Sequence, residues 1–315
     1  MNESLNTKHI GRLGQIWIYL GKFLRMFAYQ NDWKVLPMGA VIAAVVTYVV
    51  GANLFKTQEG TKLGVFALVC VCIWNGFFNS IQVVCREREI IKREHRAGLH
   101  MSSYVVAQMI YQFLLCAAQT IVTMVICRVT GVQLPKLGII TSWGVLDMAI
   151  SIFLVTYVSD MMALMVSCIV RTTTTAMTVM PFLLIFQLVF SGGFFELTGI
   201  AEKIKYLTIS HWGMDSLCSI GRYNEQPMVT LWNTIMRFKD FEIEGYKPVL
   251  EILRNMEETG AREKFLLWSG QQNTVGAYAA DASIVLKNWG ALLVLLVVFV
   301  IVAIIALEFI DRDKR

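Results

Sequence analysis

His211 and Asp215 are the pair of residues whose types and spacing come nearest to a catalytic arrangement. They lie four residues apart in the stretch HWGMD, so a helix would place both on one face, where a His–Asp pair can act as a general base. A cluster of aromatic and polar residues at a membrane interface has the same composition, and we take that structural role as the main interpretation. A phosphate-binding loop is excluded, because six residues rather than four separate Gly14 from Gly21 and no serine or threonine follows the next lysine. The sequence therefore predicts no catalytic residue and no ATPase motif in this chain.

Polar side chains inside long apolar stretches form a second group, because each is costly to bury in a membrane. Asp160 lies near the middle of one stretch, where it is either paired between helices or carries a coupled proton. Amides recur at helical spacing in two others, at Asn75, Asn79 and Gln82 and at Gln108, Gln112 and Gln119. Interhelical hydrogen bonding and the lining of a substrate pathway both account for such amides. Together with nearby aromatic residues, they lead us to predict substrate contacts for Asn75, Phe78, Asn79, Phe182 and Phe186.

Residues 85–103, CREREIIKREHRAGLHMSS, form a short, densely charged insert between two apolar stretches. A turn would suffice to join two membrane spans, so a charged amphipathic helix here favours docking onto a partner protein on the cytoplasmic side. The alternative is a solvated loop whose positive charges only set the membrane orientation. The residues predicted to couple the chain to its partner are Glu87, Arg88, Glu89, Arg93 and Glu94.

Composition indicates a membrane protein. Hydrophobic residues make up 56% of the 315, charged residues only 16%, and the mean hydropathy is +0.57. Because a bilayer core requires about 20 apolar residues per helix, we predict an all-α membrane protein with six transmembrane helices. The predicted spans are Val35–Phe55, Gly64–Val84, Tyr104–Cys127, Ile139–Val170, Ala176–Leu197 and Trp289–Leu307.

The distribution of Lys and Arg predicts the orientation of these spans. With both ends inside, the short cytoplasmic segments hold 14 of them, against 4 in the two short outer loops and their flanks. We therefore expect a multi-pass protein of the cell (plasma) membrane with cytoplasmic N and C termini. The net charge of +5 reflects this bias, so membrane lipids are expected partners and nucleic acid is not.

Four regions follow from these patterns. Residues 1–34 form a cytoplasmic arm with an amphipathic interface helix, and 35–197 hold spans 1–5 with the 85–103 insert. Residues 198–288 form a helical, re-entrant extracytoplasmic segment, with helical candidates at Met228–Phe238, Pro248–Met256 and Arg262–Trp268. Residues 289–315 hold span 6 and a basic tail. A metal site is not expected, since Cys70 and Cys72 would point in different directions on a helix.

The order of the motifs resembles a known family. Glu87-Arg88-Glu89 precede Arg93-Glu94 and Gly98, followed by Tyr104 at the start of the third span. Phe190-Ser191-Gly192-Gly193-Phe194-Phe195 end the fifth span and lead to the stretch from Tyr206 to Asp215. With an amphipathic helix first and short outer helices before the last span, the whole chain resembles the membrane (permease) subunit of an ABC transporter of the ABC-2 type, closest to the ABCG-like branch.

The resemblance implies a permease that works as a homodimer, or as a heterodimer with a second permease, together with cytoplasmic ABC ATPases. ATP and Mg would bind those ATPases, and no cofactor is expected in this chain. The 85–103 insert would receive the ATPase stroke, and the substrate cavity would lie between the second and fifth spans of the two halves. An exporter of a hydrophobic or amphipathic substrate (lipid, drug or peptide) is the leading interpretation. The alternatives are a proton-coupled carrier using Asp160 and an intramembrane enzyme using His211 and Asp215.

Overall fold

A computed structural model describes residues 11–29, 32–193, 197–242 and 246–310, and its regular elements there are helical. Four short 3-10 turns and a single bridge between Leu137 and Trp143 complete the described secondary structure. The helices are α1 (Arg12–Tyr29), α2 (Val35–Val50), α3 (Gln58–Ser80), α4 (Val83–Arg96), α5 (Met101–Val129), α6 (Gly144–Ile169), α7 (Thr173–Val189), α8 (Ile200–Ile204), α9 (Ile209–Ile220), α10 (Thr230–Arg237), α11 (Pro248–Glu258), α12 (Ala261–Gln272) and α13 (Ala282–Glu308).

Four helical segments are long and apolar enough to cross a membrane: Gln58–Arg96, which contains α3 and α4, and the helices α5, α6 and α13. The first and fifth predicted spans correspond to the shorter apolar helices α2 and α7, of 16 and 17 residues. At 1.5 Å per residue each measures about 25 Å, less than the bilayer core of about 30 Å. Helix α7 ends at Val189 rather than Leu197, and Gly192 then adopts a φ of 74°. Residues 194–196 of the predicted span lie outside the described residues.

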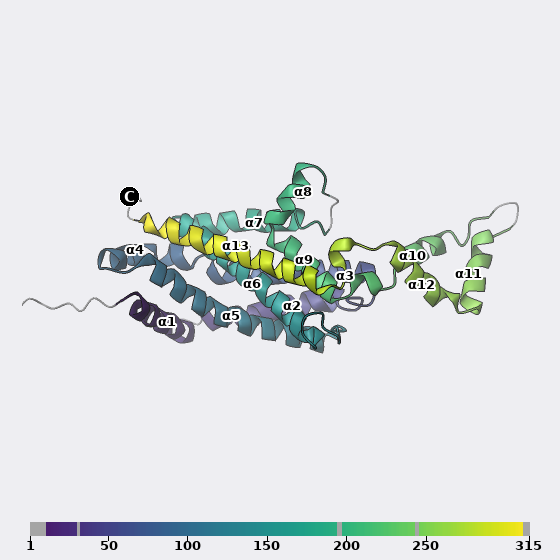
Figure 1. Ribbon diagram of the computed structural model, residues 1–315, viewed down its shortest axis with the longest axis horizontal. Coiled ribbons are helices and arrows are strands. Elements are labelled where there is room, and N and C mark those ends of the chain that lie inside the picture. The colour runs from purple at the N-terminus through teal and green to yellow at the C-terminus, as the bar shows by residue number, and fades with distance from the viewer. Residues whose placement is uncertain (1–10, 30–31, 194–196, 243–245, 311–315) are drawn as a thin grey trace, which may run out of the picture.

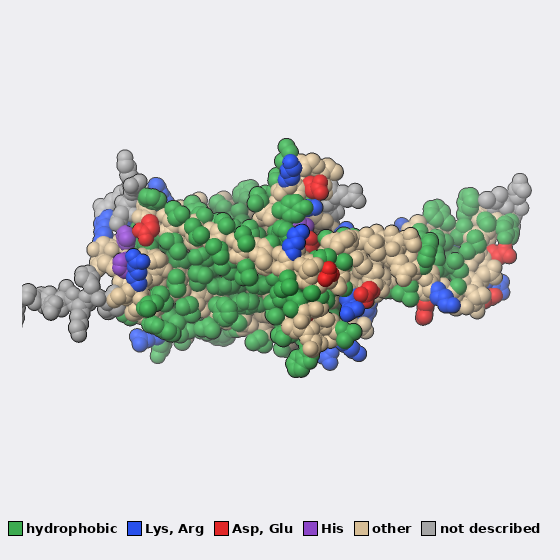
Figure 2. Space-filling view, in the orientation of Figure 1, with side chains coloured by type: hydrophobic (Ala, Val, Ile, Leu, Met, Phe, Trp, Pro, Cys, Tyr) green, Lys and Arg blue, Asp and Glu red, His purple; other side chains and the backbone are tan. Residues whose placement is uncertain are grey.

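The surface of the bundle has the pattern expected of a protein in lipid. Hydrophobic side chains cover the length of the visible face, whereas the Lys, Arg, Asp and Glu side chains gather at its two ends and on the projecting α10–α12 (Figure 2). Val41, Val294 and Ile301 are among the exposed apolar residues of the bundle, each at least half exposed. Apolar surface of this extent is stable in a bilayer rather than in water.

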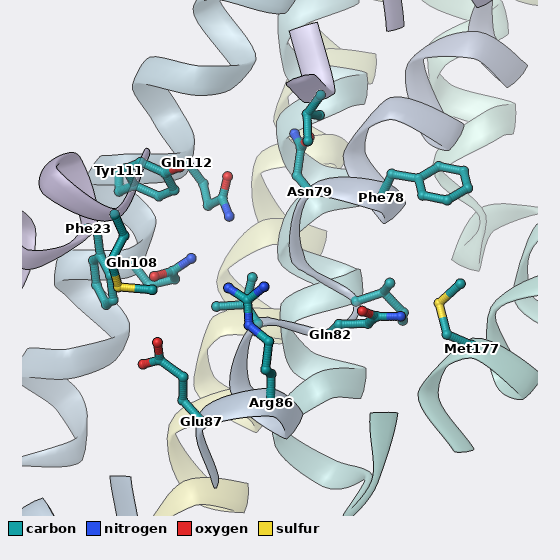
Figure 3. Close-up of a pocket in the computed structure, with 14 residues that line it drawn as sticks. Phe23, Phe78, Asn79, Gln82, Arg86, Glu87, Gln108, Tyr111, Gln112 and Met177 are labelled. Carbon is teal, nitrogen blue, oxygen red and sulfur yellow. The ribbon is translucent and has the colours of Figure 1, made fainter. Parts of the chain in front are cut away.

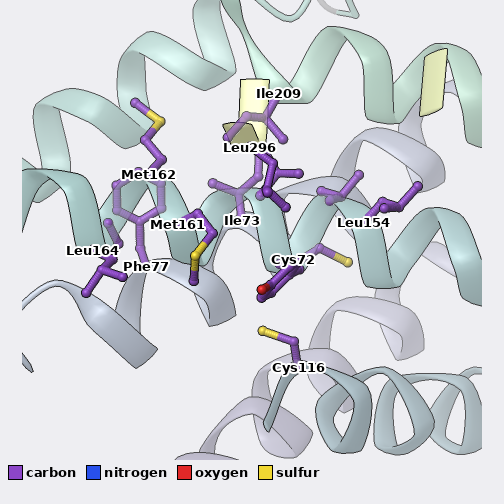
Figure 4. Close-up of a cluster of buried hydrophobic side chains, with 14 of the residues drawn as sticks. Cys72, Ile73, Phe77, Cys116, Leu154, Met161, Met162, Leu164, Ile209 and Leu296 are labelled. Atoms are coloured by element: carbon purple, nitrogen blue, oxygen red, sulfur yellow. The ribbon is translucent and has the colours of Figure 1, made fainter. Parts of the chain in front are cut away.

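Helix α6 is the centre of the bundle and is buried along most of its length. It packs closely against α3 at Gly76, where a Cβ atom would lie 2.4 Å from the carbonyl oxygen of Thr156 and 2.7 Å from the backbone nitrogen of Asp160. Apolar side chains from α3, α5, α6, α9 and α13 fill the adjoining core (Figure 4). A glycine at this position therefore lets two long helices pack backbone against backbone.

Helix α9 folds back into the bundle and packs against α3, α6 and α13. Its N-terminal backbone groups are capped by Gln187 of α7, whose Oε1 accepts from the N–H groups of Ile209 (2.8 Å) and Ser210 (3.2 Å). Side-chain capping removes the cost of burying unpaired helix-terminal N–H groups. Further along α9, Trp289 Nε1 of α13 donates to Ser216 Oγ at 3.0 Å.

Helices α10, α11 and α12 project beyond the bundle at the end opposite α4 (Figure 1). They coincide with the three short helices predicted from the sequence. Glu59, in the first turn of α3, holds this segment in place because its carboxylate accepts from the backbone N–H groups of Val229 (3.0 Å) and Thr230 (2.7 Å). Gln58 Nε2 adds a bond to the carbonyl oxygen of Gly270 at 2.9 Å.

Candidate functional site

The charged insert forms helix α4, which lies at the same end of the bundle as α1 (Figure 1). A turn at Ile81–Gln82 separates it from α3. Arg88 Nη1 donates to the carbonyl oxygens of Cys168 (2.9 Å) and Val170 (3.1 Å), which end α6. A cation at a helix C-terminus satisfies the unpaired carbonyls and the helix dipole together. Arg88 therefore attaches α4 to the central helix of the bundle.

Two polar contacts attach the other side of α4 to α1. Tyr19 Oη donates to Glu94 Oε2 at 2.7 Å, and Lys22 Nζ lies 3.2 Å from Glu87 Oε2. Burial and the nearby Glu94 carboxylate raise the pKa of Tyr19 well above its ordinary value, so its hydroxyl remains a donor at neutral pH. Sequence reasoning overlooked Tyr19, although its place on the polar stripe of the amphipathic helix could have indicated it.

The structure divides the five predicted coupling residues between two faces of α4. Glu87 and Arg88 are buried and Glu94 is half-buried, all three against neighbouring helices. Glu89 and Arg93 are exposed, and so is Ile90 between them, at 49%. One face of α4 thus packs against the neighbouring helices of the bundle. The other face exposes an acidic, a basic and an apolar side chain at the surface.

A cavity of about 300 Å³ lies directly inside α4, between α1, the α3–α4 turn and α5 (Figure 3). It brings together three of the predicted residues: Phe78 and Asn79 of α3 and Glu87 of α4. The other predicted substrate residues do not line it. Asn75 is buried against α2, where its Oδ1 would lie 3.0 Å from a Cβ at Gly39.

Phe182 and Phe186 lie on α7, away from that cavity. Phe182 is 69% exposed, and Phe186 contacts Phe190 with ring centroids 4.9 Å apart. An exposed aromatic side chain on an apolar helix is available to lipid, to a second copy of the chain or to a substrate. Substrate contact by these five residues stays a prediction.

Buried amides join α3 and α5 near Asp160. Asn79 and Gln119 exchange two hydrogen bonds of 2.9 Å each. Asn79 Nδ2 and Cys116 Sγ also lie 3.4 and 3.3 Å from Asp160 Oδ2. Asp160 is fully buried, and its Oδ1 has no hydrogen-bond partner among the described residues. Asn79 and Gln119 therefore make the interhelical hydrogen bonds that were one of the two interpretations of the amide pattern.

His211 and Asp215 lie together on α9, with Nδ1 and Oδ1 3.6 Å apart. Burial, and then the charges of Lys205 and Lys287, lower the pKa of His211 to about 4. Burial raises the pKa of Asp215 to about 7, against the opposing effect of the same lysines. The imidazole is therefore neutral and a weak base at neutral pH, which disfavours a catalytic His–Asp pair.

Comparisons with known proteins identify the family. The ABC-2 type transporter family matches residues 15–220, which run from α1 to the end of α9. A 144-residue stretch is 27% identical to the ABC transporter ATP-binding/permease protein Rv1747 of Mycobacterium tuberculosis, strain ATCC 25618 / H37Rv. That stretch covers 45% of this chain and 16% of the relative. The family match extends over more than half of the chain and includes the charged insert, the α3–α6 core and α9, so this chain belongs to the ABC-2 type transporter family.

Proposed function

We propose that this chain is the transmembrane subunit of an ABC transporter that exports a hydrophobic or amphipathic substrate such as a lipid, drug or peptide. The observation that carries the proposal is the position of α4. It is attached to α6 through Arg88 and to α1 through Glu94 and Glu87, and it presents Glu89 and Arg93 outward. A force applied to its outer face would therefore reach the central helix and the flanking helix together.

ATP hydrolysis belongs, in this proposal, to an ABC ATPase that binds ATP and Mg and docks on the outer face of α4. The name of the mycobacterial relative, which joins an ATP-binding part and a permease, supports such a pairing. We further propose a dimer of permeases in the plasma membrane, in the manner of the ABCG-like branch. It has six spans per chain, including the short α2 and α7, and both termini are cytoplasmic.

The exposed face of α4 provides the test. The tagged full-length protein is purified from its native membranes with its bound partners, and ATP-dependent export is measured in inverted vesicles. We expect an ABC ATPase to co-purify with the wild-type chain, and Arg93→Glu to reduce both its recovery and export. The matched control is Arg254→Glu on α11, another exposed arginine at the opposite end of the molecule, which should change neither. Full ATPase recovery and export in Arg93→Glu would contradict the docking assignment.

The proton-coupled carrier remains the second candidate because Asp160 is a fully buried carboxyl, one oxygen of which has no hydrogen-bond partner within the part of the chain that the structure describes. Asp160→Asn keeps the side-chain shape and removes the titratable group. Export that survives this substitution and requires ATP supports the ABC mechanism. Export that persists without ATP, stops on collapse of the proton gradient and is lost in Asp160→Asn would establish the carrier instead.

A further inference from the structure

A second cavity, of about 630 Å³, lies at the end of the bundle opposite α4 and is lined mainly by positive charges. Its walls come from the last turn of α5, the loop that joins α5 to α6, and the residues that follow α9. The charged residues of its lining are Arg128, Lys136, Arg222 and Glu225. Glu225 is paired with Arg222 at 3.1 Å, whereas neither Arg128 nor Lys136 forms an ion pair within the described ranges of the chain. These two side chains are exposed, so an anion that enters the cavity can reach both.

The backbone that surrounds this second cavity is strained at two positions. Phe55 and Arg222 both line it, and they are the two non-glycine residues with a positive φ in the part of the chain that the structure describes, at 61° and 53°. Residues other than glycine avoid such values, and those held there gather at functional sites. The strain therefore distinguishes this cavity from the rest of the molecular surface.

A chain of hydrogen bonds holds both strained positions in place. The Phe55 N–H donates to Thr61 Oγ1 at 2.9 Å, and the Thr61 hydroxyl donates in turn to Gln226 Oε1. Gln226 Nε2 donates to the carbonyl oxygen of Gly221, the residue before Arg222, at 2.6 Å. The Phe55 ring packs against Gly221, where a Cβ atom would lie 2.4 Å from the ring. This wall of the cavity is therefore fixed by the fold before a ligand binds, which lowers the cost of binding.

Apolar residues indicate that the cavity lies at a membrane surface. Leu134, Pro135 and Leu137 line it together with the cations. Leu137 is 65% exposed, and the neighbouring Val129 and Trp143 are 80% and 73% exposed. Tryptophan beside exposed aliphatic side chains is typical of the level of the lipid head groups. A ligand of this cavity would thus meet both positive charge and apolar side chains.

We propose that this second cavity binds the head group of an anionic phospholipid, with phosphatidylglycerol as its representative. Arg128 and Lys136 would bind the phosphate, because guanidinium and ammonium groups are the side-chain donors suited to that anion. The volume lies within the range of small-molecule sites and accommodates a head group and the first part of its acyl chains, which would contact Leu134 and Leu137. In the orientation proposed above, the lipid belongs to the outer leaflet. The inference goes beyond the transport proposal, since binding requires neither ATP nor a partner ATPase.

Calorimetric titration of the purified full-length protein with short-chain phospholipids in an uncharged detergent tests the proposal. Phosphatidylglycerol should bind about tenfold more tightly than phosphatidylcholine, whose choline group cancels the charge of its phosphate. Arg128→Gln and Lys136→Gln should each weaken phosphatidylglycerol binding about fivefold, and the double variant about 25-fold. Arg128→Lys keeps the charge and should retain most of the affinity, which separates lost recognition from a folding defect. The matched control is Lys62→Gln, an exposed lysine near the start of α3 that does not line this cavity, and it should have no effect.

Equal binding of the two lipids, or full phosphatidylglycerol binding by the double variant, would overturn the proposal. A loss in Lys62→Gln as large as that in Arg128→Gln would also overturn it, because the binding would then follow surface charge in general. Glycerol 1-phosphate distinguishes a lipid from a soluble phosphate compound. It lacks acyl chains and should bind about tenfold or more weakly than phosphatidylglycerol, and equal binding of the two would overturn the lipid assignment. These titrations contain no ATP, so their failure would leave the transport proposal standing, and a failure of ATP-driven export would leave the lipid site standing.

Discussion

The hydroxyl of Tyr19 donates a hydrogen bond of 2.7 Å to Glu94 Oε2 and so joins α1 to the charged helix α4. The contact lies among aromatic rings, since Tyr19 also meets Tyr104 edge to face with centroids 5.7 Å apart. The phenol is a permanent donor at neutral pH because its pKa is raised by burial and by Glu94. A bond between a neutral donor and a carboxylate in such surroundings is stronger than an exposed one.

Tyr19→Phe should therefore loosen α1 from α4 while it preserves the aromatic packing. Loss of a hydrogen bond to a charged acceptor costs about 1.5–3 kcal/mol. We expect export per ATP hydrolysed to fall while the ATPase still co-purifies, because the outer face of α4 is unchanged. The measurement is the ratio of export to ATPase rate in proteoliposomes. Tyr29→Phe on the same helix is the control, since Tyr29 is 85% exposed. An unaltered ratio of export to ATPase rate in Tyr19→Phe would show that the Tyr19–Glu94 contact does not couple α4 to α1.

The Lys22–Glu87 pair should respond asymmetrically to loss of either partner. The Glu87 side chain is 11% exposed and that of Lys22 is 32% exposed. Lys22→Met leaves the more buried charge unpaired, so it should lower thermal stability more than Glu87→Gln does. The coupling energy in a double-mutant cycle should be about 1 kcal/mol, because solvent still screens the lysine. Thermal unfolding in detergent measures the stability losses of the single variants and the coupling energy of the pair. The exposed Arg254–Glu258 pair on α11 is the reference, and we expect its coupling energy to be near zero.

Equal losses from the two single substitutions would contradict this account of the pair. They would indicate that Glu87 is hydrated through the cavity it lines rather than held by Lys22.

Gly76→Ala should destabilise the bundle, because the added methyl group would meet the backbone of α6 at 2.4 Å from Thr156 O. Backbone cannot move aside as a flexible side chain can, so we expect a loss of about 1–3 kcal/mol and poorer recovery of monodisperse protein. Gly290→Ala on α13 is the matched control, since nothing lies within 4 Å of its Cβ position. That variant should be neutral or slightly more stable, as alanine is the better helix former. A normal melting temperature for Gly76→Ala would show that α3 and α6 separate more easily than their packing indicates.

The sequence predicted helices well where one apolar stretch forms one helix. The α5 and α13 spans and the three helices of the distal segment lie where periodicity and glycine spacing indicated. The insert was also located from its charges alone. The direction of each charged side chain was not predictable, because Glu87, Glu89 and Glu94 have the same chemistry and only tertiary packing makes the first buried and the second exposed.

The cavity could not be predicted either, for a related reason. Helical spacing placed Gln108, Gln112 and Gln119 on one face of α5, yet nothing in that spacing distinguishes an amide with a partner from one without. Gln119 forms hydrogen bonds with Asn79 across the interface, whereas the Oε1 atoms of Gln108 and Gln112 are buried without a hydrogen-bond partner among the described residues. Such a difference depends on the distance between helices that are remote in sequence.

Orientation in the membrane can be tested with two single-cysteine reporters at opposite ends of the molecule. Arg93→Cys lies on the exposed face of α4, and Arg254→Cys lies on α11, where the native side chain is 77% exposed. Background labelling should be low, because six of the seven native cysteines are buried and Cys70 is half-buried. With cytoplasmic termini, a membrane-impermeant maleimide should label Arg254→Cys in intact cells and Arg93→Cys only after lysis. Labelling of Arg93→Cys from outside would place α4 beyond the reach of any cytoplasmic ATPase and remove the basis for its coupling role.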